Sequence, residues 1–270
     1  MREAPRWRPP RQPRPTMPDI PLLPALLTFL LGGALGAVGG LFGIGGGLIA
    51  IPALGLLYGM DQQLAQGTAL VMIAPNVLIG FWQYRRRADI ALRTALVLGL
   101  SAVLATYVGA RLATEMDAVL LRRIFALFMI GMAVYFLWRL LPGRAVTAQQ
   151  QRLSSRWIPA VGVVGGAMSG FFGVGGGVVA APALVGLFGF RQAAAQGLAL
   201  ALVTPGAVVA LATYAQARHV DWASGIPLSL GGMLTISWGV ALAHRMPERQ
   251  LRAWFSACLI AIAVVMLVRG

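Results

Sequence analysis

Ten apolar runs, separated by short polar loops, fill almost the whole chain after its first twenty residues. With 58% hydrophobic and only 11% charged residues, a single soluble core could not hide this much apolar surface. We therefore predict an all-α polytopic membrane protein whose helices contact the lipid bilayer. The runs are Pro21–Phe42, Leu48–Gly59, Gln66–Tyr84, Ala91–Ala110, Val119–Trp138, Trp157–Phe172, Val178–Phe190, Gln196–Ala217, Ile226–Ala243 and Trp254–Val268.

Two of these runs are too short to cross a bilayer as helices. Leu48–Gly59 and Val178–Phe190 hold only about a dozen residues, and a helix of that length covers roughly 18 Å of a core roughly 30 Å thick. We interpret both as re-entrant half-helices. The sequence then predicts about eight transmembrane helices plus two short broken half-helices.

The order of the runs repeats at a shift of 130 positions. Between Gly36/Gly166 and Tyr84/Tyr214, about 22 of the 49 aligned pairs are identical without a gap, including glycines, prolines and glutamines. Shared apolar composition alone would not align these residues. The pattern predicts two duplicated halves, a first transmembrane repeat over 21–141 and a second over 157–270, joined by a cytoplasmic linker over 142–156.

All 22 basic residues are arginines, and they lie in the N-terminal tail and the loops. In a soluble protein a net charge of +14 would point to nucleic acid, but here we read it as topology-setting charge and expect no nucleic-acid partner. Eight spans divide the arginines fifteen to seven in favour of the side that holds both termini, whereas ten full spans give ten to twelve. The rule that positive loops face the cytoplasm then favours eight spans with cytoplasmic termini, and four spans per half would make the halves parallel.

Residues 1–20 differ from the rest of the chain, because five arginines alternate there with prolines. Such a segment has no core to pack, and it lacks a cleavage site after a short apolar stretch. We expect a disordered basic cytoplasmic tail, with Met17 as an alternative start.

Each half contains a glycine-rich helix that then breaks. Gly32, Gly36 and Gly40, and likewise Gly162, Gly166 and Gly170, recur every four residues, which predicts close helix packing. Three successive glycines then interrupt the helix at membrane depth, where free backbone groups are tolerated only inside protein or beside a polar cavity. The first N–H groups of the following short helix would be free to bind an anion. Turns that merely kink the helices for packing are the alternative.

Polar residues lie near both breaks. Gln66 and Gln196 precede long apolar runs at matching positions, Thr68, Asn76, Thr204 and Thr213 fall within those runs, and Pro75 and Pro205 interrupt them. Each could bind a ligand or only another helix. The candidate substrate-binding residues are Gly43, Gly45, Gly46, Gly47, Pro52, Gln66, Thr68, Asn76, Gly173, Gly175, Gly176, Gly177, Pro182, Gln196 and Thr204.

The residues that are missing narrow the function further. All eight acidic residues fall in the tail or in loops, which disfavours a cation pathway, and the absence of lysine excludes a phosphate-binding P-loop. His219 and His244 are isolated and Cys258 is the single cysteine, so we expect neither a metal site nor another cofactor. These features favour a small anion as the substrate.

The pair of Gly-[Ile/Val]-Gly-Gly-Gly-x-x-x-x-Pro-Ala-Leu motifs, each followed by Ala-Gln-Gly, resembles the sulfite exporter TauE/SafE family of membrane transporters. The resemblance covers Leu31 to the C-terminus. It implies a multi-pass bacterial inner-membrane protein that moves sulfite, organosulfonates or related short anions. The hydroxyl residue that members often have after the Ala-x-Gly step is present as Thr68 but is replaced by Leu198 in the second half.

We therefore expect a secondary transporter or exporter of small anions that alternates access around the two breaks, coupled to a proton or ion gradient. A non-transporting membrane scaffold is the alternative. A membrane enzyme would need Arg111, His219 or His244 to act without the usual partners, so we expect no enzymatic activity. Glycine-rich faces also make a homodimer plausible.

Overall fold

The computed structural model describes residues 22–42, 45–87, 90–138, 153–243, 246 and 248–268. The predicted disordered tail, Gly43 and most of the predicted linker lie outside the described residues. The described α-helices are α1 (Leu22–Phe42), α2 (Gly47–Tyr58), α3 (Gln62–Arg87), α4 (Leu92–Glu115), α5 (Ala118–Trp138), α6 (Ile158–Phe172), α7 (Gly177–Phe188), α8 (Gln192–Gln216), α9 (Trp222–Ala243) and α10 (Glu248–Val268), with a 3₁₀ turn at Ser155–Trp157.

Six of the described helices are long and apolar enough to cross a membrane: α1, α3, α4, α5, α8 and α9. α2 and α7 are helices of 12 residues each, as the two short runs predicted. α6 has 15 residues, and the first turn of α10 contains charged residues. The all-helical membrane architecture thus agrees with the prediction, with six candidate spans where about eight were expected.

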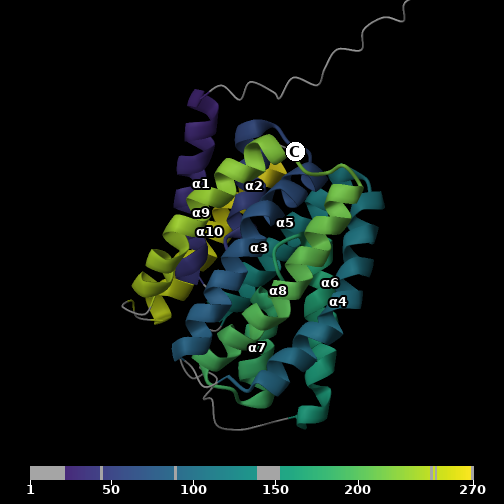
Figure 1. Ribbon diagram of the computed structural model, residues 1–270, viewed down its shortest axis with the longest axis vertical. Coiled ribbons are helices and arrows are strands. Elements are labelled where there is room, and N and C mark those ends of the chain that lie inside the picture. Colours follow the sequence, from purple (N-terminus) through teal and green to yellow (C-terminus); the bar gives the residue numbers. More distant parts are fainter. Residues whose placement is uncertain are drawn as a thin grey trace, which may run out of the picture.

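The glycine stripes of α1 and α6 bring backbones into contact, as predicted. Gly32, Gly36 and Gly40 lie against Leu228, Gly232 and Ile236 of α9, where an added Cβ would overlap backbone atoms. Gly162, Gly166 and Gly170 lie in the same way against Leu98, Ala102 and Thr106 of α4. Because residue numbers rise together in both pairs, α1 is parallel to α9, and α6 is parallel to α4. The first helix of each half therefore packs on the fourth helix of the other half (Figure 1).

The central helices α3 and α8 are antiparallel. The hydroxyl of Tyr214, near the end of α8, donates to Oε1 of Gln66, near the start of α3, at 2.5 Å. At the other end of the pair, the hydroxyl of Tyr84 donates to Oε1 of Gln196 at 2.7 Å. The sequence shift of 130 positions converts each of these hydrogen bonds into the other.

The remaining contacts give the direction of the other helices. Along α9, Gly225 packs on Val71 and Ser237 accepts a hydrogen bond from Gln83, so α9 is parallel to α3. Along α4, Gly99 packs on Ala201 and Thr106 on Gly206, so α4 is parallel to α8. α1, α3 and α9 therefore run in one direction and α4, α6 and α8 in the other.

The predicted parallel relation of the two halves is wrong, because α1 and α6 run in opposite directions. The reason is that α2 returns to the end of the molecule where α1 starts, and Thr28 and Tyr58 join the two helices by a 2.6 Å hydrogen bond there. Each half thus crosses the molecule an odd number of times, five in all. The start of α1 and the end of α10 lie at the same end of the molecule (Figure 1).

These directions also change the arginine count. Helices that alternate in this way correspond to the division of ten to twelve that the sequence gives for ten full spans. The fifteen-to-seven division that favoured cytoplasmic termini does not hold in this arrangement.

Three loop aspartates mark where helices begin. Asp61, Asp117 and Asp221 accept backbone N–H bonds of 2.8–3.0 Å at the starts of α3, α5 and α9. A carboxylate at this position satisfies free N–H groups and complements the helix dipole. These acidic residues therefore have structural roles at the starts of helices.

Candidate functional site

The first glycine break joins α1 to α2. Gly45 and Gly46 have φ values of +71° and +89°, in the left-handed region that favours glycine, and Gly46 is the N-cap of α2. No side chain caps this helix, and the amides of Ile49 and Ala50 both bond back to the carbonyl of Gly46. The N–H groups at the start of α2 therefore have no partner within their own helix.

The second break repeats this arrangement between α6 and α7. Gly173 and Gly175 have φ values of +65° and +80°, and Gly176 is an N-cap without a side-chain hydrogen bond. The amides of Val179 and Ala180 bond to the carbonyl of Gly176. Gly177, like Gly47, is the first residue of its short helix.

The two breaks meet inside the protein. A Cβ built on Gly47 would lie 3.2 Å from the Cα of Val174 in the other break. The described residues Gly45 to Leu48 and Gly173 to Gly176 are all buried. Two helix N-termini thus lie close together in the interior of the protein.

Asn76 lies in the segment of α3, Met72 to Val77, that packs against the first break. It is fully buried, and neither of its amide atoms has a hydrogen-bond partner among the described residues. Met72, one turn earlier on the same face of α3, packs against Gly46, and Val77, the residue after Asn76, packs against Gly45. The side chain of Met72 also reaches Gly232 of α9, where it lies beside the Asn76 amide. An unpartnered donor and acceptor are therefore buried next to the start of α2.

The second half has different polar groups in the matching region. The shift of 130 positions places Gly206 at the position of Asn76 and Ser169 at that of Gly39. The hydroxyls of Thr106 and Ser169 flank Gly206, 3.1 Å and 3.6 Å from where its Cβ would stand. Both are buried without a hydrogen-bond partner in the described part of the chain. The carbonyl of Ser169 accepts the amide of Gly173, so this residue lies one turn before the break.

Gln66 and Gln196 do not line one shared site. Tyr84, the partner of Gln196, is 18 residues from Gln66 on α3, which corresponds to about 27 Å along the helix. The two glutamines therefore lie at opposite ends of the pair of central helices, α3 and α8. Gln66 packs on Gly173 at the second break, and its Nε2 has no partner among the described residues.

The other candidates have structural contacts. Thr68 accepts the backbone N–H of Asp221 at 3.0 Å and thus links α3 to the start of α9. Thr204 donates to the carbonyl of Leu200 in its own helix at 2.7 Å. Pro52 is buried within α2, and Pro182 is half-buried within α7. These four residues position helices around the breaks and leave no free polar atom there.

Sequence reasoning missed Thr106 and Ser169. Both lie in helices whose apolar character dominates the pattern, and a single hydroxyl residue in a membrane helix usually bonds to its own backbone. Tyr84 and Tyr214 carried a usable signal, because they align at the shift of 130 positions together with Gln66 and Gln196.

Comparison with known proteins places this chain in a family. The family model described as sulfite exporter TauE/SafE matches residues 28–266. The chain is 29% identical over 254 residues to a "Probable membrane transporter protein" of Xylella fastidiosa, covering 90% of this chain and 95% of that protein. It is 25% identical over 262 residues to one of Methanocaldococcus jannaschii, covering 89% and 94%, and 27% identical over 229 residues to one of Bacillus subtilis, covering 84% and 92%. No solved structure matches it. The chain belongs to the sulfite exporter TauE/SafE family of membrane transporters.

Proposed function

We propose that this transporter moves small anions, such as sulfite, organosulfonates or short carboxylates, by alternating access around the two glycine breaks. The proposal rests on one observation: unpartnered polar groups are buried beside each break, Asn76 at one and Thr106 with Ser169 at the other. A buried polar group without a partner costs about 1–3 kcal/mol, so a bound anion would offset this cost. Helix N-termini and uncharged donors suit an oxyanion in a region without carboxylates.

The opposite directions of the two halves suit alternating access. We treat α6 and α10 as spans in addition to the six candidate spans, and α2 and α7 as short helices that return from the breaks, which together give the ten crossings of the fold. Two halves of opposite orientation around one buried site can exchange conformations, so that the site opens first to one side and then to the other. Coupling to a proton or ion gradient, a homodimer and the bacterial inner membrane are parts of the same proposal.

A flux assay tests this function. Purified protein in liposomes should take up sulfite, sulfoacetate or acetate under an imposed gradient. Asn76→Leu, or Thr106→Val combined with Ser169→Ala, should lower uptake at least tenfold. Thr204→Val is the matched control, because its hydroxyl already bonds within α8. Absence of uptake for every anion would refute the proposal and favour a scaffold.

The arrangement of the halves has its own test by cysteine labelling. In a Cys258→Ala background, single cysteines at Arg123 and Arg218 should react from one side of the membrane, and those at Arg86 and Arg191 from the other. Parallel halves would instead pair Arg86 with Arg218. The side that faces the cytoplasm follows from the same experiment, and labelling of Arg123→Cys from the cytoplasm would support the predicted cytoplasmic termini.

A further inference from the structure

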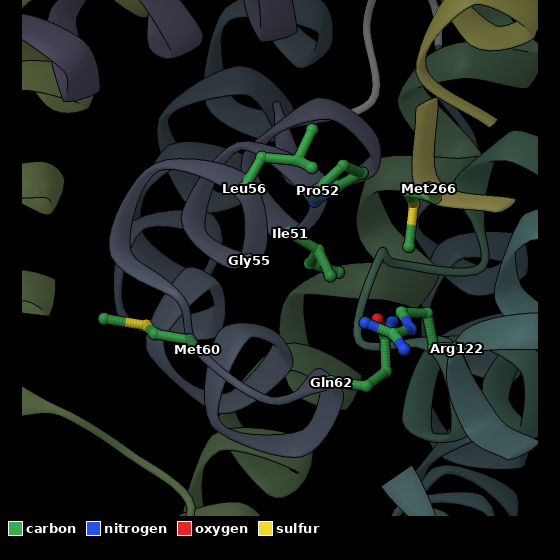
Figure 2. Close-up of a pocket in the computed structure, with 8 residues that line it drawn as sticks. All are labelled: Ile51, Pro52, Gly55, Leu56, Met60, Gln62, Arg122 and Met266. Atoms are coloured by element: carbon green, nitrogen blue, oxygen red, sulfur yellow. The ribbon is translucent and has the colours of Figure 1, made fainter. Parts of the chain in front are cut away.

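A separate cavity lies at the end of the molecule where α1 starts and α10 ends. It has a volume of about 200 Å³ and is lined by Ile51, Pro52 and Gly55 of α2, Gln62 of α3, Arg122 of α5 and Met266 of α10, among others (Figure 2). A water molecule in the liquid takes roughly 30 Å³, so the cavity can hold a small oxyanion with several waters. From Gly55 to Gly47 at the first break, α2 rises about 12 Å. The cavity is therefore distinct from the buried site but lies along the same helix.

The two polar side chains that line this cavity, Gln62 and Arg122, carry hydrogen-bond donors suited to an anion. Figure 2 shows the head groups of Gln62 and Arg122 next to each other on one wall. Gln62 is only 5% exposed, and its Nε2 has no hydrogen-bond partner among the described residues. Arg122 is half-buried, and its planar guanidinium matches the geometry of an oxyanion. None of the described residues that line the cavity is acidic.

The same pair of residues recurs in the second half of the sequence. The shift of 130 positions converts Gln62 into Gln192 and Leu121-Arg122 into Leu251-Arg252. Gln192 begins α8 and Arg252 lies near the start of α10. Because α3 and α8 are antiparallel, these positions belong to the opposite end of the molecule. Each end thus carries one glutamine and one arginine at matching positions.

From these observations, we infer that Gln62 and Arg122 form an anion-binding site at one mouth of the transport path. It binds small oxyanions before they reach the break or after they leave it. This inference rests on the proposed function. A phosphate group of an anionic lipid has the same chemistry as a free oxyanion, so the test must separate the two sources.

Sulfite uptake into liposomes of neutral lipid tests the site. Arg122→Gln and Gln62→Leu should each raise the KM for sulfite about tenfold and leave the maximal rate within about twofold, since a hydrogen bond to a charged group is lost. Arg122→Lys should give an intermediate KM and shows that the fold tolerates substitution there. Arg123→Gln is the matched control, because it removes the same charge from the exposed neighbouring residue. An unchanged KM in both Arg122→Gln and Gln62→Leu would overturn the inference.

A binding measurement separates this site from the inner one. In an Asn76→Leu background, sulfite should still raise the melting temperature of the detergent-purified protein, and adding Arg122→Gln should abolish this protection. Protection without any uptake by the wild-type protein would refute transport but support the mouth site. Protection by an anionic lipid that depends on Arg122, with none by sulfite, would overturn the inference in favour of a lipid site.

Discussion

Replacing Asn76 by leucine should make the protein more stable and at the same time stop anion transport. Asn76 is fully buried, and both its amide oxygen and its amide nitrogen lack partners among the described residues. A buried polar group in this state costs about 1–3 kcal/mol. Leucine has nearly the same shape and branches at the same atom, so the substitution should recover about this free energy without overfilling the site.

The size of the effect is measurable by thermal unfolding. For a chain of this size, 1 kcal/mol corresponds to roughly 2–4 °C in melting temperature, so an increase of about 2–12 °C is expected in detergent without added anion. Sulfite uptake by the same variant should fall at least tenfold, because the substrate loses its amide ligand. The control Thr204→Val removes a hydroxyl that already has a hydrogen-bond partner. It should lower the free energy of unfolding by about 0.6 kcal/mol, the average contribution of a side-chain hydrogen bond inside a membrane protein.

Two results would refute this reasoning. A lower melting temperature in Asn76→Leu would mean that the amide has a stabilising partner in the folded protein. A higher melting temperature with unchanged uptake would mean that the unpartnered amide has no part in binding the substrate. Either outcome would remove the main support for an inner anion site at the first break.

Two further predictions concern packing and the central helix pair. Gly36→Ala should destabilise the protein by about 1–3 kcal/mol, because the new methyl group would overlap the backbone of α9. Gly131→Ala is the control, since no atom lies within 4 Å of the Cβ that it would add, and it should be neutral or stabilising in the same thermal assay. Tyr214→Phe should lower the free energy of unfolding by about 1 kcal/mol or more, because it leaves the fully buried Gln66 without its hydrogen-bond partner. Tyr84→Phe should lower it less, because Gln196 is half-buried and can bond to water instead. Equal melting temperatures within either pair would contradict the argument.

The sequence alone determined most of the local structure. The lengths of the apolar runs predicted the two 12-residue helices, because helix length follows directly from residue number. Glycine spacing predicted which faces of α1 and α6 would pack closely, and the triple glycines marked the breaks, since only residues without a Cβ adopt these conformations at little cost. Such features depend on residues that are close in the sequence, so the sequence pattern alone is enough to predict them.

Only the tertiary structure decided the direction of the halves and which polar groups share a site. α2 returns to the end where α1 begins, and this reverses the second half relative to the first; run length could not decide it, because a short helix can return to either side. Gln66 and Gln196 occupy matching positions in sequence yet lie at opposite ends of α3 and α8. Thr106 and Ser169 come together only because α4 and α6 pack side by side, a contact between residues 63 positions apart that no local pattern encodes.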